Sequence, residues 1–61
     1  MTFKEFNKWC NERAADGCWS LNTAITCIAI NVYMNKVPFY RRKKVWKEYQ
    51  YVAEQIVRET E

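Results

Sequence analysis

Histidine is missing from this chain of 61 residues, and aspartate, glycine and proline each occur once, as Asp16, Gly17 and Pro38. Without histidine, the chain lacks the commonest general base and a common metal ligand. No serine or cysteine has an evident base near it in the sequence, so the pattern of an activated nucleophile is missing as well. The sequence therefore indicates a binding protein, and it predicts neither an enzymatic activity nor a cofactor.

The three cysteines, Cys10, Cys18 and Cys27, are an odd number and lie far apart. A structural zinc site needs four thiolate or imidazole ligands, usually arranged in close pairs, so we expect no metal site. We interpret the cysteines as small apolar residues with reduced thiols, while a ligand set shared between copies or an intermolecular disulfide stays open. No apolar leader precedes the first amphipathic segment, so the expected location is the cytoplasm.

The hydrophobic pattern predicts an all-α protein, with one domain over residues 1–61 and helices over residues 3–15, 21–35 and 38–59. The first helix begins with a capping box, Thr2-Phe3-Lys4-Glu5, and ends at Gly17, which suits the left-handed position after a helix. We expect Ser20 or Asn22 to cap the second helix and Pro38 to separate it from the third. Short connections then predict a compact three-helix unit.

The central segment, Leu21–Met34, carries no charge and has apolar residues on two sides of a helix. Such a helix is buried on both sides, and a core this small needs a staple or oligomerisation, so we expect a homo-oligomer. The apolar part is too short for a membrane span of about 20 residues, so no membrane contact is expected. The pattern alone does not fix which side meets another copy. Our prediction places Leu21, Ile25, Ile28 and Val32 on the core of their own chain, and Cys27, Ile30 and Met34 on the oligomer interface.

Charge is distributed unevenly along the chain, although the net charge is only +3. Residues 37–50 carry five basic side chains against Glu48, a net charge of +4, whereas residues 51–61 carry −2. Basic residues thus crowd the start of the third helix, where the helix dipole favours anions, and acidic residues close its end. Three explanations stay open: an anion site, an antiparallel pairing in which each basic start meets Glu59 and Glu61 of another copy, or a solvated turn.

The anion site has a clear chemical basis. Free N–H groups at a helix start and basic side chains suit a phosphate group, and tyrosine rings suit stacking on a base. Trp9, Trp19 and Trp46 are instead expected in the core, because a small bundle gains buried area from large rings. The candidate ligand-binding residues are Tyr40, Arg41, Arg42, Lys43, Lys44, Lys47 and Tyr51.

Three segments carry a resemblance to known proteins: Trp9-Cys10-Asn11-x-Arg13, Asp16-Gly17-Cys18-Trp19, and Pro38-Phe39 with the basic run after it. With these segments, the chain resembles small uncharacterised helical proteins encoded by phages and prophages of Gram-positive bacteria. The resemblance implies a setting, the host cytoplasm, where small phage proteins often antagonise immunity. It thus implies a protein that sequesters an anionic, nucleotide-type ligand with a basic and aromatic site at or near a subunit interface. The alternatives are an inhibitor of a host defence protein, such as an anti-CRISPR, and, less expected, a nucleic-acid-binding helical module.

Overall fold

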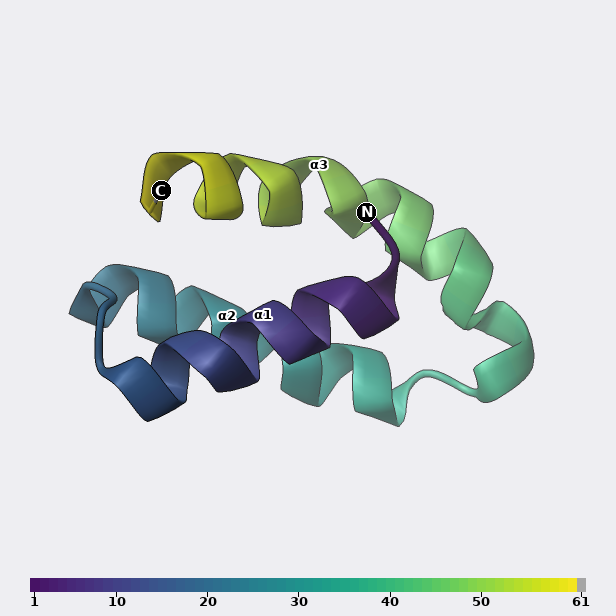
Figure 1. The fold of residues 1–61 in the computed structure, drawn as a ribbon. Helices are drawn as coiled ribbons and strands as arrows, with labels where there is room; N and C mark the ends of the chain where they lie inside the picture. Colours follow the sequence, from purple (N-terminus) through teal and green to yellow (C-terminus); the bar gives the residue numbers. More distant parts are fainter. Residues whose placement is uncertain (61) are drawn as a thin grey trace.

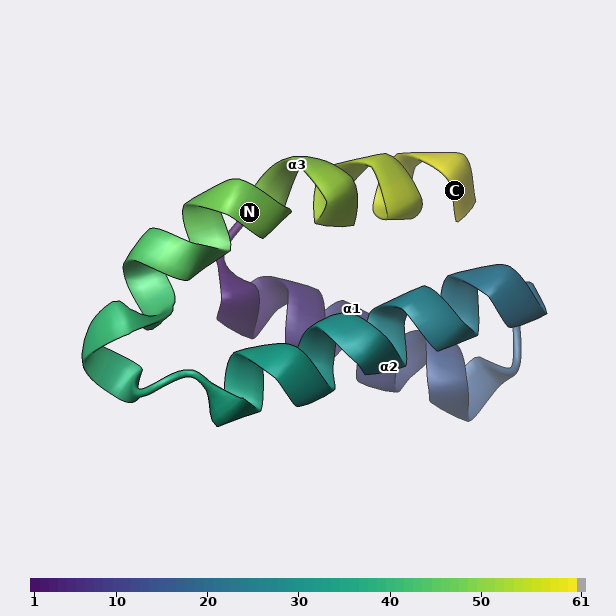
Figure 2. The same ribbon diagram turned by 180° about the vertical axis from the view of Figure 1, so that it is seen from behind.

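The computed structural model describes residues 1–60, which contain three α-helices and no strand (Figure 1). The helices are α1 (Phe3–Asp16), α2 (Leu21–Lys36) and α3 (Phe39–Thr60), so the predicted all-α, three-helix unit is confirmed. α1 and α2 lie side by side, and α3 bends over them (Figures 1 and 2). Within residues 1–60, no helix combines the length and the apolar composition that crossing a membrane requires.

The ends of α1 and the start of α2 follow the local signals in the sequence. The hydroxyl of Thr2 accepts a hydrogen bond from the Glu5 N–H (3.2 Å), and the Glu5 carboxylate accepts one from the Thr2 N–H (3.0 Å). Gly17 adopts the left-handed conformation, with φ of 66°, and its N–H donates to the Arg13 carbonyl (2.8 Å). Ser20, rather than Asn22, caps α2. These ends could be predicted because each cap depends only on neighbouring residues.

The end of α2 depends instead on a side chain from α3. Arg42 donates from Nε to the Val37 carbonyl (3.0 Å) and from Nη2 to the Asn35 carbonyl (3.4 Å). The last carbonyls of a helix have no partner within the helix, so a cation there satisfies them and complements the helix dipole. Arg42 therefore joins the end of α2 to the start of α3.

All three helices contribute to one small core, and each tryptophan packs in it or against it, as predicted. Phe6, Cys27 and Met34 have no exposed surface, while Trp9 and Trp19 are partly buried at its edge. On α3, Trp46 and Ala53 are buried, whereas Val52 is 42% exposed. The buried members are Phe6, Cys10, Cys27, Ile30, Met34, Trp46 and Ala53.

The two apolar sides of α2 have the reverse of their predicted burial. Cys27, Ile30 and Met34 are at most 6% exposed, so the prediction that they form an oligomer interface is wrong. They belong to the core of their own chain, where a small thiol and a flexible thioether fill the irregular space between α1 and α3. The other side is open to solvent: Leu21 is 75%, Ile25 56%, Ile28 58% and Val32 49% exposed.

Candidate functional site

A groove of about 650 Å³ lies between the start of the chain and α3. Among the described residues, three basic side chains and one carboxylate line it, so its charge is positive. Its volume falls within the range of about 300–1,000 Å³ that is typical of small-molecule sites. The lining residues are Met1, Thr2, Phe3 and Glu5 on one side and Arg42, Lys43, Trp46, Lys47 and Gln50 on the other.

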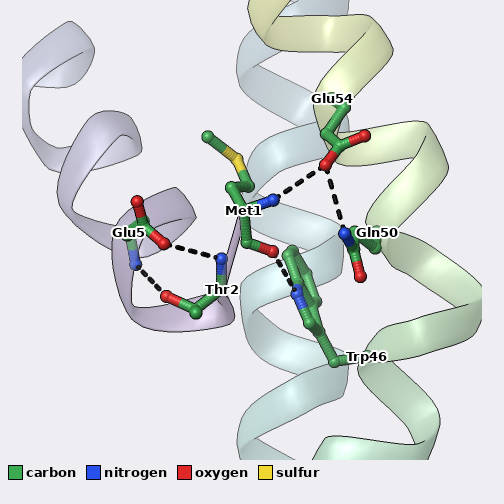
Figure 3. A network of polar contacts seen from close by, with 6 residues as sticks. All are labelled: Met1, Thr2, Glu5, Trp46, Gln50 and Glu54. Atoms are coloured by element: carbon green, nitrogen blue, oxygen red, sulfur yellow. Dashed lines mark hydrogen bonds and ion pairs between the residues drawn. The ribbon is translucent and has the colours of Figure 1, made fainter.

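Polar contacts fix the two walls of the groove relative to each other (Figure 3). The indole N–H of Trp46 donates to the Met1 carbonyl (2.9 Å), and the Met1 ammonium forms an ion pair with Glu54 (2.8 Å). The Gln50 amide donates to the same Glu54 oxygen (3.2 Å). The Met1 ammonium and the Gln50 amide together hold the pKa of Glu54 below its ordinary value. The start of the chain is therefore held against the middle of α3.

The Glu5 carboxylate, which lines the groove, already accepts a hydrogen bond in the cap of α1. The backbone N–H of Thr2, and after it the Thr2 hydroxyl, lower the pKa of Glu5 below its ordinary value. Figure 3 shows the carboxylate turned toward the Thr2 amide. Glu5 therefore stays ionised near neutral pH, and the three basic side chains of the opposite wall still leave the groove with a positive net charge.

The apolar side of the groove is built from aromatic rings. Trp46 is 7% exposed, and its ring lies 5.4 Å from that of Phe3 and 5.6 Å from that of Phe6, measured between centroids. Tilted ring pairs at such separations are favourable contacts. Phe3 is only partly buried, so the groove offers an aromatic surface beside its cations.

The candidate ligand-binding residues divide between two sides of α3. Arg42, Lys43 and Lys47 line the groove, but the Arg42 guanidinium also holds the end of α2. Arg41 and Lys44 are exposed and do not line the groove.

The two candidate tyrosines lie outside the groove. Tyr40, Lys44 and Tyr51 follow one another at helical spacing of four and seven residues, so they share a side that we call the α3 outer face, and Lys47 lies between this side and the groove. Tyr40 is 75% and Tyr51 69% exposed there. The structure therefore does not bring these tyrosines to the cations of the groove, where Phe3 and Trp46 supply the rings instead.

The thiols form no part of the groove. Burial raises the pKa of Cys10, and burial together with the neighbouring Cys10 raises the pKa of Cys27 to about 12. Both thiols therefore stay protonated near neutral pH, which makes them poor nucleophiles and poor metal ligands. Cys18 is exposed, and among residues 1–60 no three potential metal-ligating side chains come together.

Comparisons of the chain with models of protein families, with curated proteins and with solved structures found no significant match. The groove joins a concave shape, an aromatic surface and positive charge, the features that typify a site for a small anionic ligand.

Proposed function

We propose that this protein is a non-enzymatic binding protein that captures a small anionic ligand of the nucleotide type in the groove between α1 and α3. The observation that carries this proposal is the position of Lys43 and Lys47, one helical turn apart, beside the rings of Phe3 and Trp46. Lysine ammonium groups bind phosphate as point charges, and an aromatic surface suits the face of a base. We place the site within one chain, so capture needs no residue from a second copy.

We further propose that capture of the ligand antagonises host immunity. The resemblance to small phage proteins provides the setting, the host cytoplasm, where nucleotides serve as immune signals. A protein that sequesters such a signal needs affinity and abundance but no catalytic group, which agrees with the lack of histidine. We also propose that the chain forms a homo-oligomer.

Isothermal titration calorimetry with a panel of cyclic nucleotides and ADP-ribose derivatives tests the nucleotide site. We expect at least one member to bind with one ligand per chain, and K43E/K47E to weaken binding by at least about a hundredfold, because it removes two charge-assisted contacts of about 1.5 kcal/mol or more each. R41E/K44E is the matched control, since it makes the same change in net charge at two exposed basic residues outside the groove. No heat from any member of the panel would contradict the proposal.

The α3 outer face favours a second candidate function, the inhibition of a host defence protein, for example as an anti-CRISPR. Tyr40 and Tyr51 are 75% and 69% exposed on α3, and exposed tyrosines are common at the centre of protein interfaces. A pull-down from host lysate would then retain a stoichiometric protein, and Y40A/Y51A would lose it. Binding of a nucleic acid by the same face would instead weaken steeply as the salt concentration rises.

A further inference from the structure

The exposed apolar side of α2 is the largest feature that the groove does not explain. We call Leu21, Ile25, Ile28 and Val32 the outer stripe of α2; each is about half exposed or more. Their spacing of four, three and four residues is that of the seam between two packed helices. Ala24 and Ala29 flank the stripe with small side chains, which allow another helix to approach closely.

The surface around the outer stripe carries no charge. No charged residue lies between Asp16 and Lys36 in the sequence. A shallow groove of about 260 Å³ beside the stripe adds Asn7, Asn11 and Ala14 of α1, which are also uncharged. Like charges repel, so two copies of a chain with a net charge of +3 meet most easily on such a surface.

We propose that the outer stripe binds a second copy of this chain, with the two α2 helices antiparallel about a two-fold axis between Thr26 and Cys27. The stripe is symmetric about that point, because Ile25 and Ile28 lie equally far from it, as do Leu21 and Val32. Ile25 then packs against the partner's Ile28, and Leu21 against the partner's Val32. A two-fold interface requires this kind of self-complementary surface.

Charge decides between the two possible orientations of the helices. A parallel pair would place both Lys36 side chains, and the two basic starts of α3 that follow, at the same end of the dimer. An antiparallel pair places them at opposite ends and also aligns the two helix dipoles favourably. The antiparallel orientation therefore costs less electrostatic energy.

The area of the stripe sets the expected strength of the dimer. Standard interfaces bury about 800 Å² on each partner, roughly one sixth of the 4621 Å² surface of this chain. α2 has 16 residues and is about 24 Å long, so the stripe needs the neighbouring surface of α1 to reach that area. We therefore expect a dissociation constant in the micromolar range, at the weak end for interfaces of this size.

The dimer specifies the copy number that the proposed function leaves open, but it does not rest on the nucleotide site. The residues that line the α1–α3 groove include none from α2. If no ligand bound, the proposed dimer would be unaffected, and if no dimer formed, the proposed ligand site would be unaffected. The two proposals are also tested by different measurements, heat of binding and molecular mass.

Light scattering between about 1 µM and 1 mM protein tests the dimer. We expect the mass to approach twice 7.4 kDa as the concentration rises. I25K/I28K should remain at 7.4 kDa with unchanged helix content, because both side chains are exposed in the single chain. I28A should raise the dissociation constant about tenfold or more by removing buried apolar area from both copies. V52K, which makes a similar change at an exposed valine of α3, is the control and should leave the mass unchanged.

A mass of 7.4 kDa for the unaltered chain over this whole range would overturn the proposal. A mass of I25K/I28K that rises with concentration as the mass of the unaltered chain does would overturn it as well. A spin label on the exposed Cys18 tests the orientation, because Cys10 and Cys27 are buried and resist labelling. At 1.5 Å per residue, the antiparallel arrangement places the two helix starts at Leu21 about 16 Å apart along the axis, and the interhelical spacing of about 8–10 Å adds to this separation. We expect a label-to-label distance above about 20 Å, and a shorter distance or no dipolar signal would overturn the arrangement.

Discussion

Trp46 is the residue that joins the core to the candidate site. Its ring packs against Phe3 and Phe6, and its N–H donates to the Met1 carbonyl across 45 positions of sequence. One side chain therefore contributes both apolar burial and the contact that holds the start of the chain in place. In a core of so few residues, such a side chain has a large share of the total stability.

W46F separates the apolar burial of the Trp46 ring from its hydrogen bond to the Met1 carbonyl, because phenylalanine keeps a ring but has no N–H. We expect the loss of the hydrogen bond, with some loss of packing, to destabilise the fold by about 1–2 kcal/mol. For a domain of this length that corresponds to a fall in melting temperature of at least about 5 °C, measured by circular dichroism. W19F, at a partly exposed position, is the control and should cost less. Equal losses in both variants would show that the Met1 contact contributes nothing.

The three thiols should differ sharply in reactivity. Cys18 is exposed, whereas the pKa of Cys27 is raised from 9.0 to about 12, which lowers its thiolate population about a thousandfold. In the folded protein we therefore expect N-ethylmaleimide to add once per chain, at Cys18, and to add three times after denaturation. Mass spectrometry of timed samples measures this, and a rapid second adduct under native conditions would contradict the burial of Cys10 and Cys27.

Glu54 should make stability depend on acid pH. Its folded pKa lies below the ordinary value of 4.5, so its contribution is fully present above 4.5 and is lost as the pH falls through the folded pKa. Melting temperatures of the unaltered chain and of E54Q should therefore differ at neutral pH and converge in acid. E48Q is the control, because Glu48 forms no ion pair within residues 1–60. A constant difference across the pH range would mean that the Met1–Glu54 ion pair is not formed in solution.

At the scale of helices, the sequence predicts where each element lies but not how two elements meet. The caps at Thr2, Gly17 and Ser20 are local, and their prediction is confirmed. The two apolar sides of α2 are nearly opposite one another and have similar hydrophobicity, so periodicity cannot tell which side faces α1 and α3. In the structure, the side with Cys27 and Met34 is the one that packs in the core with residues of α1 and α3.

Arg42 explains part of the unfavourable charge at the start of α3. Its guanidinium caps α2, a contact that links residues five and seven positions apart across the connection. R42A should therefore destabilise the fold by about 1 kcal/mol, because it leaves carbonyls at the end of α2 without a donor. R41A is the matched control and should be neutral or slightly stabilising, since it only removes a cation from a helix start. Chemical unfolding measures both, and equal effects would contradict the capping role.

At the scale of the whole molecule, the candidate site could be predicted only in part. The basic start of α3 is visible in the sequence, and Lys43 and Lys47 do line the groove. The opposite wall, from Met1 to Glu5, is far from α3 in sequence, so no spacing along the chain points to it. The pairing of basic residues with Glu59 and Glu61 of another copy stays a prediction, and Glu61 lies outside the described residues.

The arrangement of the two surfaces predicts that ligand capture and assembly are separable. The groove belongs to the start of the chain and α3, whereas the outer stripe belongs to α2. I25K/I28K should therefore bind a nucleotide with the same affinity per chain as the unaltered protein, and K43E/K47E should keep its concentration-dependent mass. Calorimetry measures the affinity of both variants for the nucleotide, and light scattering measures their mass. If the monomeric variant lost its affinity for the ligand, the site would lie at a subunit interface, as the sequence alone suggested, and the groove within one chain would be only part of it.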